Sequence, residues 1–133
     1  MEDFVTYELA VKLKEKGFRK PCIATYDKDG MLGYNYVQPT SIRVVGFDEC
    51  LVYSNDCVMA PTISQVLKWL RKEKKIFIAI FIDDDSDIPV TYEIYKGSEC
   101  VCTHQGEYFM LKDWNKCELR AIEYALDNLI KIY

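Results

Sequence analysis

The chain has 133 residues, half of them apolar, and a formal net charge of −4. This length suits one domain over residues 1–133, and the content of aromatic and branched aliphatic residues excludes a disordered chain. The longest apolar run, Ile76–Ile82, is too short to cross a membrane, and the N-terminal segment lacks a secretion signal, so we expect a cytoplasmic protein.

The first expected element is a helix over residues 7–16. Thr6 suits its N-cap, and Glu8 places a negative charge in the first turn, where the helix dipole favours it. Gly17 fits the left-handed position that ends a helix, and Phe18 beyond it can fold back onto the last turn.

Residues 22–26 and 33–37 are expected to form a hairpin. The segment 27–30 between them reads Asp-Lys-Asp-Gly, which is typical of a tight turn. Two short strands, over 42–45 and 50–53, are expected to follow.

The second expected helix begins at Thr62, which forms a capping box with Gln65. The apolar stripe of this helix comprises Ile63, Val66, Leu67 and Leu70. The strand over 76–82 comes next. It is apolar on both faces, so we expect it near the centre of a sheet.

Residues 90–96 alternate between apolar and polar side chains, which predicts a half-buried strand. A further strand is expected over 99–103, and a last helix begins near Asp113 or Asn115 and reaches the chain end. The apolar stripe of the last helix comprises Leu119, Ile122, Leu126, Leu129 and Ile130. This order of elements predicts an α+β fold, a mainly antiparallel sheet with about three helices packed on one face.

Six cysteines are present, and without a secretion signal we expect reduced thiols rather than a disulfide framework. Cys100, Cys102 and His104 share one face of the expected strand, and with Cys117 they offer four ligands to a zinc ion. The spacing matches no familiar zinc motif, so the alternative interpretation is two half-buried thiols and a surface histidine.

Asp83, Asp85 and Asp87 have the spacing of a calcium loop, but Ile88 and Ile94 stand where that loop needs glycine and glutamate. We therefore interpret the segment as a solvated hairpin loop. The sequence also lacks a phosphate-binding glycine motif, and a single histidine gives little support to nucleophilic catalysis. We expect no cofactor and assign no catalytic residue.

A basic cluster stands near Trp69 at the end of the second expected helix. Phosphate contact is one interpretation, and a solvated helix face with favourable charges at its C-terminus is the other. The acidic net charge favours the second interpretation. The cluster comprises Lys68, Arg71, Lys72, Lys74 and Lys75.

Tyrosines are concentrated on the expected strands. Tyrosine is favoured in strands and is also enriched at protein interfaces, so an uncovered tyrosine-rich sheet face would suit a partner or a second copy of the chain. Ordinary sheet packing is the alternative. The candidate interface residues are Tyr34, Tyr36, Tyr92 and Tyr95.

Three parts of the chain resemble small uncharacterised proteins that are common in Bacteroidetes genomes and in their phages and mobile elements. These parts are Val5–Ala10 with Lys14–Phe18, Ala60–Arg71, and Ala121–Leu126. The resemblance implies a cytoplasmic bacterial protein of prophage origin. That family has no assigned activity, so the resemblance assigns no catalytic residue.

The sequence favours a small non-enzymatic accessory protein that acts through contacts with a protein partner or with itself. The tyrosine-rich strands and the missing catalytic motifs support this hypothesis. One alternative is a nucleic-acid-associated protein of a mobile element, and another is a small metal-dependent enzyme.

Overall fold

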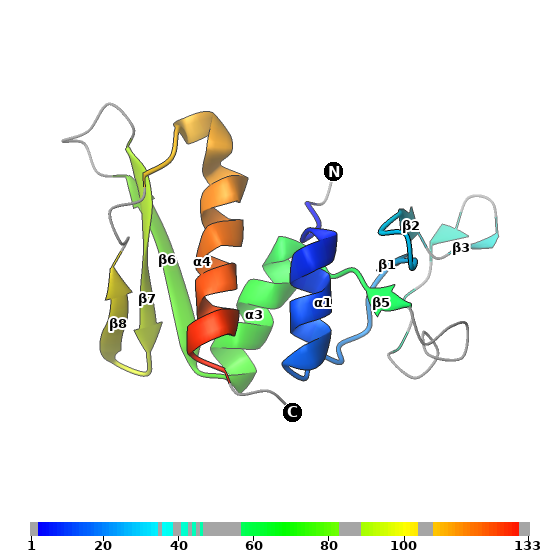
Figure 1. Cartoon of the computed structure of the whole chain (residues 1–133), viewed down its shortest axis with the longest axis horizontal. Coiled ribbons are helices and arrows are strands. Elements are labelled where there is room, and N and C mark those ends of the chain that lie inside the picture. Colours follow the sequence, from blue (N-terminus) through cyan, green and yellow to red (C-terminus); the bar gives the residue numbers. More distant parts are fainter. Residues whose placement is uncertain are drawn as a thin grey trace. The chain divides into compact units, whose positions relative to one another are not determined.

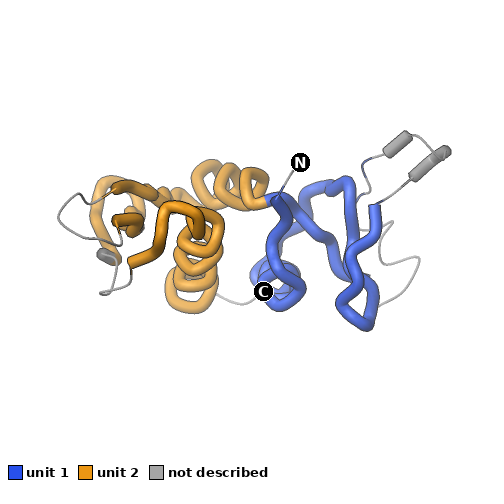
Figure 2. The backbone as a smooth tube through the Cα atoms, turned by 90° about the horizontal axis from the view of Figure 1, so that it is seen from above, with its two compact units in different colours: residues 1–62, 131–133 blue, residues 63–130 orange. Residues whose placement is uncertain are grey.

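The computed structural model describes residues 3–34, 36–38, 41–42, 44, 46, 57–82, 89–103 and 108–130. These residues form helices and antiparallel strands, which confirms the predicted α+β class (Figure 1). They cluster into two compact units, one before residue 63 and the other over residues 63–130 (Figure 2). The expectation of a single domain stays a prediction.

In the first unit, helix α1 (Tyr7–Glu15) begins at the predicted residue and ends one residue before the predicted end. Thr6 Oγ1 accepts a hydrogen bond from an amide of the first turn at 3.3 Å, which satisfies a donor that the helix leaves unpaired. Gly17 has a φ of +92°, and the Phe18 amide donates to the Leu13 carbonyl at 2.9 Å, as a Schellman ending requires. The Phe18 and Leu13 side chains are buried, so this ending is anchored in the core.

The expected hairpin turn is also present. Asp27 Oδ1 accepts hydrogen bonds from the amides of Asp29 and Met31 at 2.8 and 3.0 Å. Gly30 takes a φ of +78°, and a Cβ built on it would stand 3.4 Å from the Tyr7 ring. The turn therefore favours glycine for its backbone conformation, and the Tyr7 ring packs against it.

The strands of the first unit form two small antiparallel sheets. Strand β1 (Ala24–Tyr26) lies between β2 (Leu32–Tyr34) and β5 (Val58–Met59), and β3 (Tyr36–Gln38) pairs with β4 (Ser41–Ile42). The expected second strand of the hairpin is thus divided between two sheets. The β5 strand, which the sequence did not predict, completes the first sheet, and the expected strand over 50–53 lies outside the described residues.

In the second unit, helix α3 (Ile63–Glu73) starts directly after Thr62, as predicted. Its buried residues are Ile63, Val66, Trp69 and Leu70. Trp69 therefore belongs to the core, while Leu67 of the expected stripe is half-buried. The chain leaves the helix through Lys75, whose φ of +58° is the left-handed conformation in which a helix commonly ends.

The sheet of the second unit differs from the expected arrangement. Strand β7 (Val90–Lys96) is the central strand, between β6 (Ile76–Ile82) and β8 (Glu99–Thr103), and both pairings are antiparallel. The prediction that 76–82 lies at the centre is wrong within this sheet. Among the strands that the structure describes, β6 pairs on one side only. Its apolar residues on both faces therefore need another explanation.

Helix α4 (Trp114–Asn128) follows a short 3-10 turn, η1 (Leu111–Asp113), and so begins beside one of the two predicted N-caps. Its buried residues are Cys117, Ala121, Ile122, Ala125 and Leu126. Leu119 of the expected stripe is half-buried, and the small side chains of Cys117 and Ala121 lie in the core instead.

Candidate functional site

The sheet of the second unit has two different faces. Val90, Tyr92 and Ile94 of β7 are buried on the inner face. Ile94 pairs with Cys102, Cys102 lies near Tyr124 of α4, and α4 packs against β7, so α4 lies on this inner face. The opposite face has no such helix among the described residues.

We call that opposite side the outer face. It is formed where Phe77, Ala79 and Phe81 of β6 pair with Tyr95, Glu93 and Thr91 of β7. Phe77 is 49% exposed, and Ala79 is also exposed. Phe81 is half-buried and Thr91 is buried, so the exposed part of the outer face is the end that carries Phe77 and Ala79. A large apolar side chain exposed on a sheet face suits a surface that contacts another protein.

A polar pair stands next to this apolar row. Tyr95 Oη donates a hydrogen bond to Glu93 Oε2 at 2.5 Å. This hydrogen bond, which favours the protonated phenol, is the main cause that raises the pKa of Tyr95. The pair fixes two polar groups beside exposed apolar side chains, an arrangement common at the rim of an interface.

The second part of the site is the β6 edge, the side of strand 76–82 that faces away from β7. Within the described residues, no hydrogen bond joins this edge to another segment. The pairing with β7 runs without a bulge from Ile76–Lys96 to Ile82–Val90, and Ile82 is 50% exposed. The strand also contains no proline and no charge. It therefore lacks the usual features that prevent an edge strand from pairing with another chain.

The predicted interface tyrosines do not gather on one face. Tyr34 is exposed in the first unit, where its ring meets Phe4 edge-on at 5.6 Å. The Tyr36 side chain lies outside the described residues. Tyr92 is 1% exposed and belongs to the core, so a surface role for it is wrong. Of the four, Tyr95 alone lies on the outer face.

The basic cluster lies at the end of α3 as predicted. Lys68, Arg71, Lys72 and Lys75 are exposed, and Lys74 is half-buried. Two of these ammonium groups have intramolecular partners. Lys74 Nζ stands 5.4 Å from the centre of the Trp69 ring, and Lys75 Nζ donates to the Lys72 carbonyl at 3.2 Å. The cluster is therefore an exposed basic surface in which one lysine makes a cation–π contact and another makes a hydrogen bond at the helix end.

The cysteines of the proposed zinc site do not share one environment. A bulge interrupts the β7–β8 pairing, because Ile94 pairs with Cys102 while the next residue, Tyr95, pairs with Cys100. Cys100 is consequently exposed and Cys102 is buried, whereas regular alternation would have placed them on one face. Cys117 is buried in α4. His104 lies outside the described residues, as do Asp83, Asp85 and Asp87.

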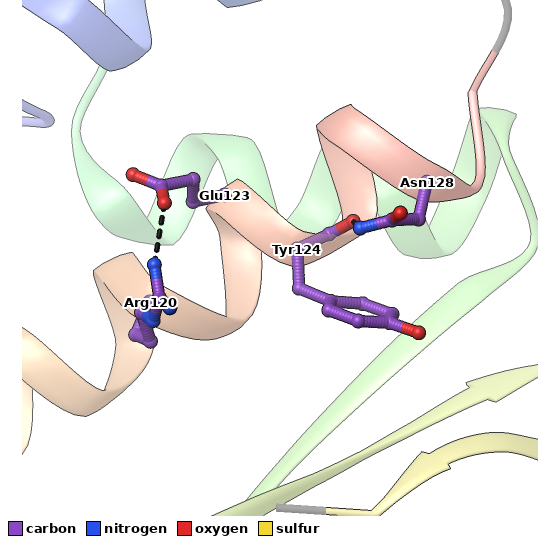
Figure 3. A network of polar contacts seen from close by, with 4 residues as sticks. All are labelled: Arg120, Glu123, Tyr124 and Asn128. Carbon is purple, nitrogen blue, oxygen red and sulfur yellow. Dashed lines mark hydrogen bonds and ion pairs between the residues drawn. The ribbon is translucent and has the colours of Figure 1, made fainter. Parts of the chain in front are cut away.

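No group of three or more potential ligands that could hold a metal ion occurs within the part of the chain that the structure describes. Cys102 instead contacts Tyr124, whose ring points from α4 towards the strands (Figure 3). The pKa of Tyr124 is raised, first by the nearby Cys102 charge and then by burial. One turn earlier in the same helix, Arg120 Nη1 pairs with Glu123 Oε1 at 2.6 Å (Figure 3).

The redox state of the cysteines also differs from the expectation. Cys57 is disulfide-bonded, and its partner lies outside the described residues. The prediction that all six thiols are reduced is therefore wrong, although Cys22, Cys100, Cys102 and Cys117 are free. Disulfide bonds persist mainly in oxidising compartments, so a cytoplasmic location stays a prediction.

Comparison of the chain with protein-family models, with curated proteins and with solved structures gives no match. Among the described helices, none combines the length and the apolar character that a membrane span needs. The candidate site is therefore defined by its own geometry.

The sequence identified the β6 segment but not its exposure. A strand that is apolar on both faces usually lies inside a sheet, so the pattern predicts that Phe77, Ala79 and Ile82 are core residues. One signal pointed the other way. The strand comes directly after a helix and before two strands with short or moderate connections, an order typical of an antiparallel meander whose first strand is an edge.

Proposed function

We propose that this chain is a non-enzymatic protein that acts through protein–protein contact, and that the β6 edge and the outer face are its contact surface. The observation that carries the proposal is a seven-residue uncharged strand, 76–82, with exposed Phe77 and Ile82 and with one edge that has no partner among the described residues. Leaving such a strand open to water exposes both apolar area and a row of backbone donors and acceptors.

A partner strand would cover the apolar area and would also pair the backbone donors and acceptors of the edge. Addition of a strand to a sheet edge provides main-chain hydrogen bonds, and the side chains on either face add apolar contact. The outer face would extend that contact beyond the edge, because Phe77 and Ala79 lie directly beside β7. The Tyr95–Glu93 pair would border the contact with polar groups.

Affinity capture from cells that produce the chain tests this proposal. Phe77→Lys puts a charge into the contact surface, and we expect it to reduce partner recovery about tenfold or more, as at a central interface residue. The control is Leu111→Lys, which changes a 58% exposed residue of the same unit that belongs to η1 and not to β6 or β7. Equal recovery with both variants, or recovery of nucleic acid and no protein, would reject the proposal.

The exposed basic cluster supports nucleic-acid binding as the second candidate. Three of its members, Lys68, Arg71 and Lys72, are exposed on one helix. If these residues contact phosphates, reversing their charge should abolish a gel shift at low salt and flatten the salt dependence of binding. The absence of a shift with the unchanged chain at low salt would exclude this candidate.

A further inference from the structure

The β6 strand is complementary to itself in the antiparallel direction. Ala79 is its middle residue, so a two-fold axis through Ala79 places Ile76 opposite Ile82 and Phe77 opposite Phe81. Each pair consists of two large apolar side chains, and the smallest side chain meets its own copy at the axis. The strand thus offers the same surface to both copies, as an isologous two-fold interface requires.

The side chains fit this arrangement on the outer face. Phe77 of one copy and Phe81 of the other would lie side by side on each flank of the two Ala79 methyl groups. Cross-strand aromatic pairs of this kind stabilise antiparallel sheets. The exposed ring of Phe77 would also lose much of its contact with water.

The charges that border the strand select the same direction. Lys74 and Lys75 precede Ile76, and Asp83, Asp84 and Asp85 follow Ile82 in the sequence. In sequence order alone, antiparallel pairing sets the basic residues before one strand against the acidic residues after the other. Parallel pairing would bring like charges together, at a cost of stability. Opposite charges at its two borders therefore suit the strand to an antiparallel copy of itself.

We propose that the β6 edge pairs with the β6 edge of a second copy, antiparallel about a two-fold axis at Ala79, so that the described strands β6, β7 and β8 of both copies form one continuous sheet. The inference rests on the proposed function and names its partner. It also explains why strand 76–82 is apolar on both faces. Within the described part of one chain the strand is an edge, and it becomes a central strand when two chains pair.

A charge exchange at the axis tests the proposal in the full chain. Ala79→Lys places two ammonium groups directly opposite each other in the paired state, while the exposed position tolerates lysine in the single chain. Light scattering after size exclusion should give twice 15.6 kDa for the unchanged chain and half of that dimer mass for Ala79→Lys. Ala79→Glu should behave in the same way, and an equimolar mixture of the two variants should regain the dimer mass.

Two controls keep the outcomes distinct. Leu111→Lys should remain dimeric, and circular dichroism should show that every variant is folded. If the position 79 variants do not fold, hydrogen exchange of the β6 amides in the unchanged chain replaces them, and it should slow as protein concentration rises. A monomeric unchanged chain, a dimeric Ala79→Lys or a mixture that stays monomeric would overturn the pairing.

Failure of this inference can be told from failure of the proposed function. A monomeric chain that still captures a protein, and loses it with Phe77→Lys, means that the edge serves a different partner. A monomeric chain whose captures do not depend on Phe77 contradicts both the self-pairing and the proposed function.

Discussion

Tyr26 on β1 donates a hydrogen bond from its phenolic oxygen to the backbone carbonyl oxygen of Val5 at 2.5 Å. Both residues are buried, and the Tyr7 ring meets the Tyr26 ring edge-on at 5.6 Å. This bond connects the strand to the segment that precedes α1. Because the carbonyl is shielded from water, its partner matters more for stability than a surface hydroxyl would.

Tyr26→Phe should therefore lower the free energy of unfolding by about 1–3 kcal/mol, because the ring remains while the Val5 carbonyl loses its donor. Urea unfolding at neutral pH measures this change. Tyr7→Phe is the matched control, since it also removes a phenolic hydroxyl from the same aromatic pair, and it should change the free energy by less than about 0.5 kcal/mol. Equal effects of the two variants would show that the bond contributes nothing specific.

The same tyrosine predicts a dependence of stability on alkaline pH. Burial, and secondarily the Glu8 carboxylate, raise the pKa of Tyr26 above its ordinary value of about 10. The unfolded chain then releases this proton at a lower pH than the folded chain does. The contribution to stability is thus complete below about pH 10 and is lost as the pH rises through the folded-state pKa. Tyr95 and Tyr124 act in the same direction.

Urea unfolding between about pH 9 and about pH 11 tests this sign. The unchanged chain should lose stability across the range, and Tyr26→Phe should lose less, because the variant lacks one of the groups that titrate. A steeper loss in the variant would contradict the assignment.

The helix ends could be predicted because their signals are local. The Thr6 cap and the Gly17 stop need only residues within one turn of the helix, and the structure contains both. The Asp27–Gly30 turn is predictable for the same reason. In each case a side chain or a positive φ satisfies backbone groups of its own neighbourhood, so distant contacts do not decide the outcome.

Gly17→Ala tests whether the Schellman ending of α1 contributes to the stability of the chain. At a φ of +92° an alanine Cβ is strained, so we expect a loss of about 1–2 kcal/mol in the free energy of unfolding. Gly33→Ala is the control, because Gly33 does not have a positive φ and a Cβ there meets no atom within 4 Å. That variant should be neutral or more stable. A smaller loss at Gly17 than at Gly33 would contradict the Schellman ending.

The strand partners could not be predicted, because pairing is decided between segments that are distant in sequence. Strand β5 has two residues, and its partner β1 lies more than thirty positions earlier. Two residues are too few to form a periodic pattern from which the strand could be predicted. The position of β6 at a sheet edge depends on which strands meet it, whereas its apolar pattern records only which faces avoid water. The candidate site was missed for this reason, and the tyrosine composition pointed partly to a core residue, Tyr92.

The β8 bulge is the remaining non-local feature, and thiol chemistry reports on it. Cys100 is exposed and its thiol donates to the Cys102 carbonyl at 3.7 Å, while Cys102, Cys117 and Cys22 are buried. Iodoacetamide without reductant should therefore modify Cys100 at least about tenfold faster than the buried thiols, which must wait for local opening. Peptide mass spectrometry over time measures the rates, and Cys100→Ser should remove the fast phase. A regular strand would give Cys100 and Cys102 the same face and similar rates, so equal modification of the two would show that the bulge is absent.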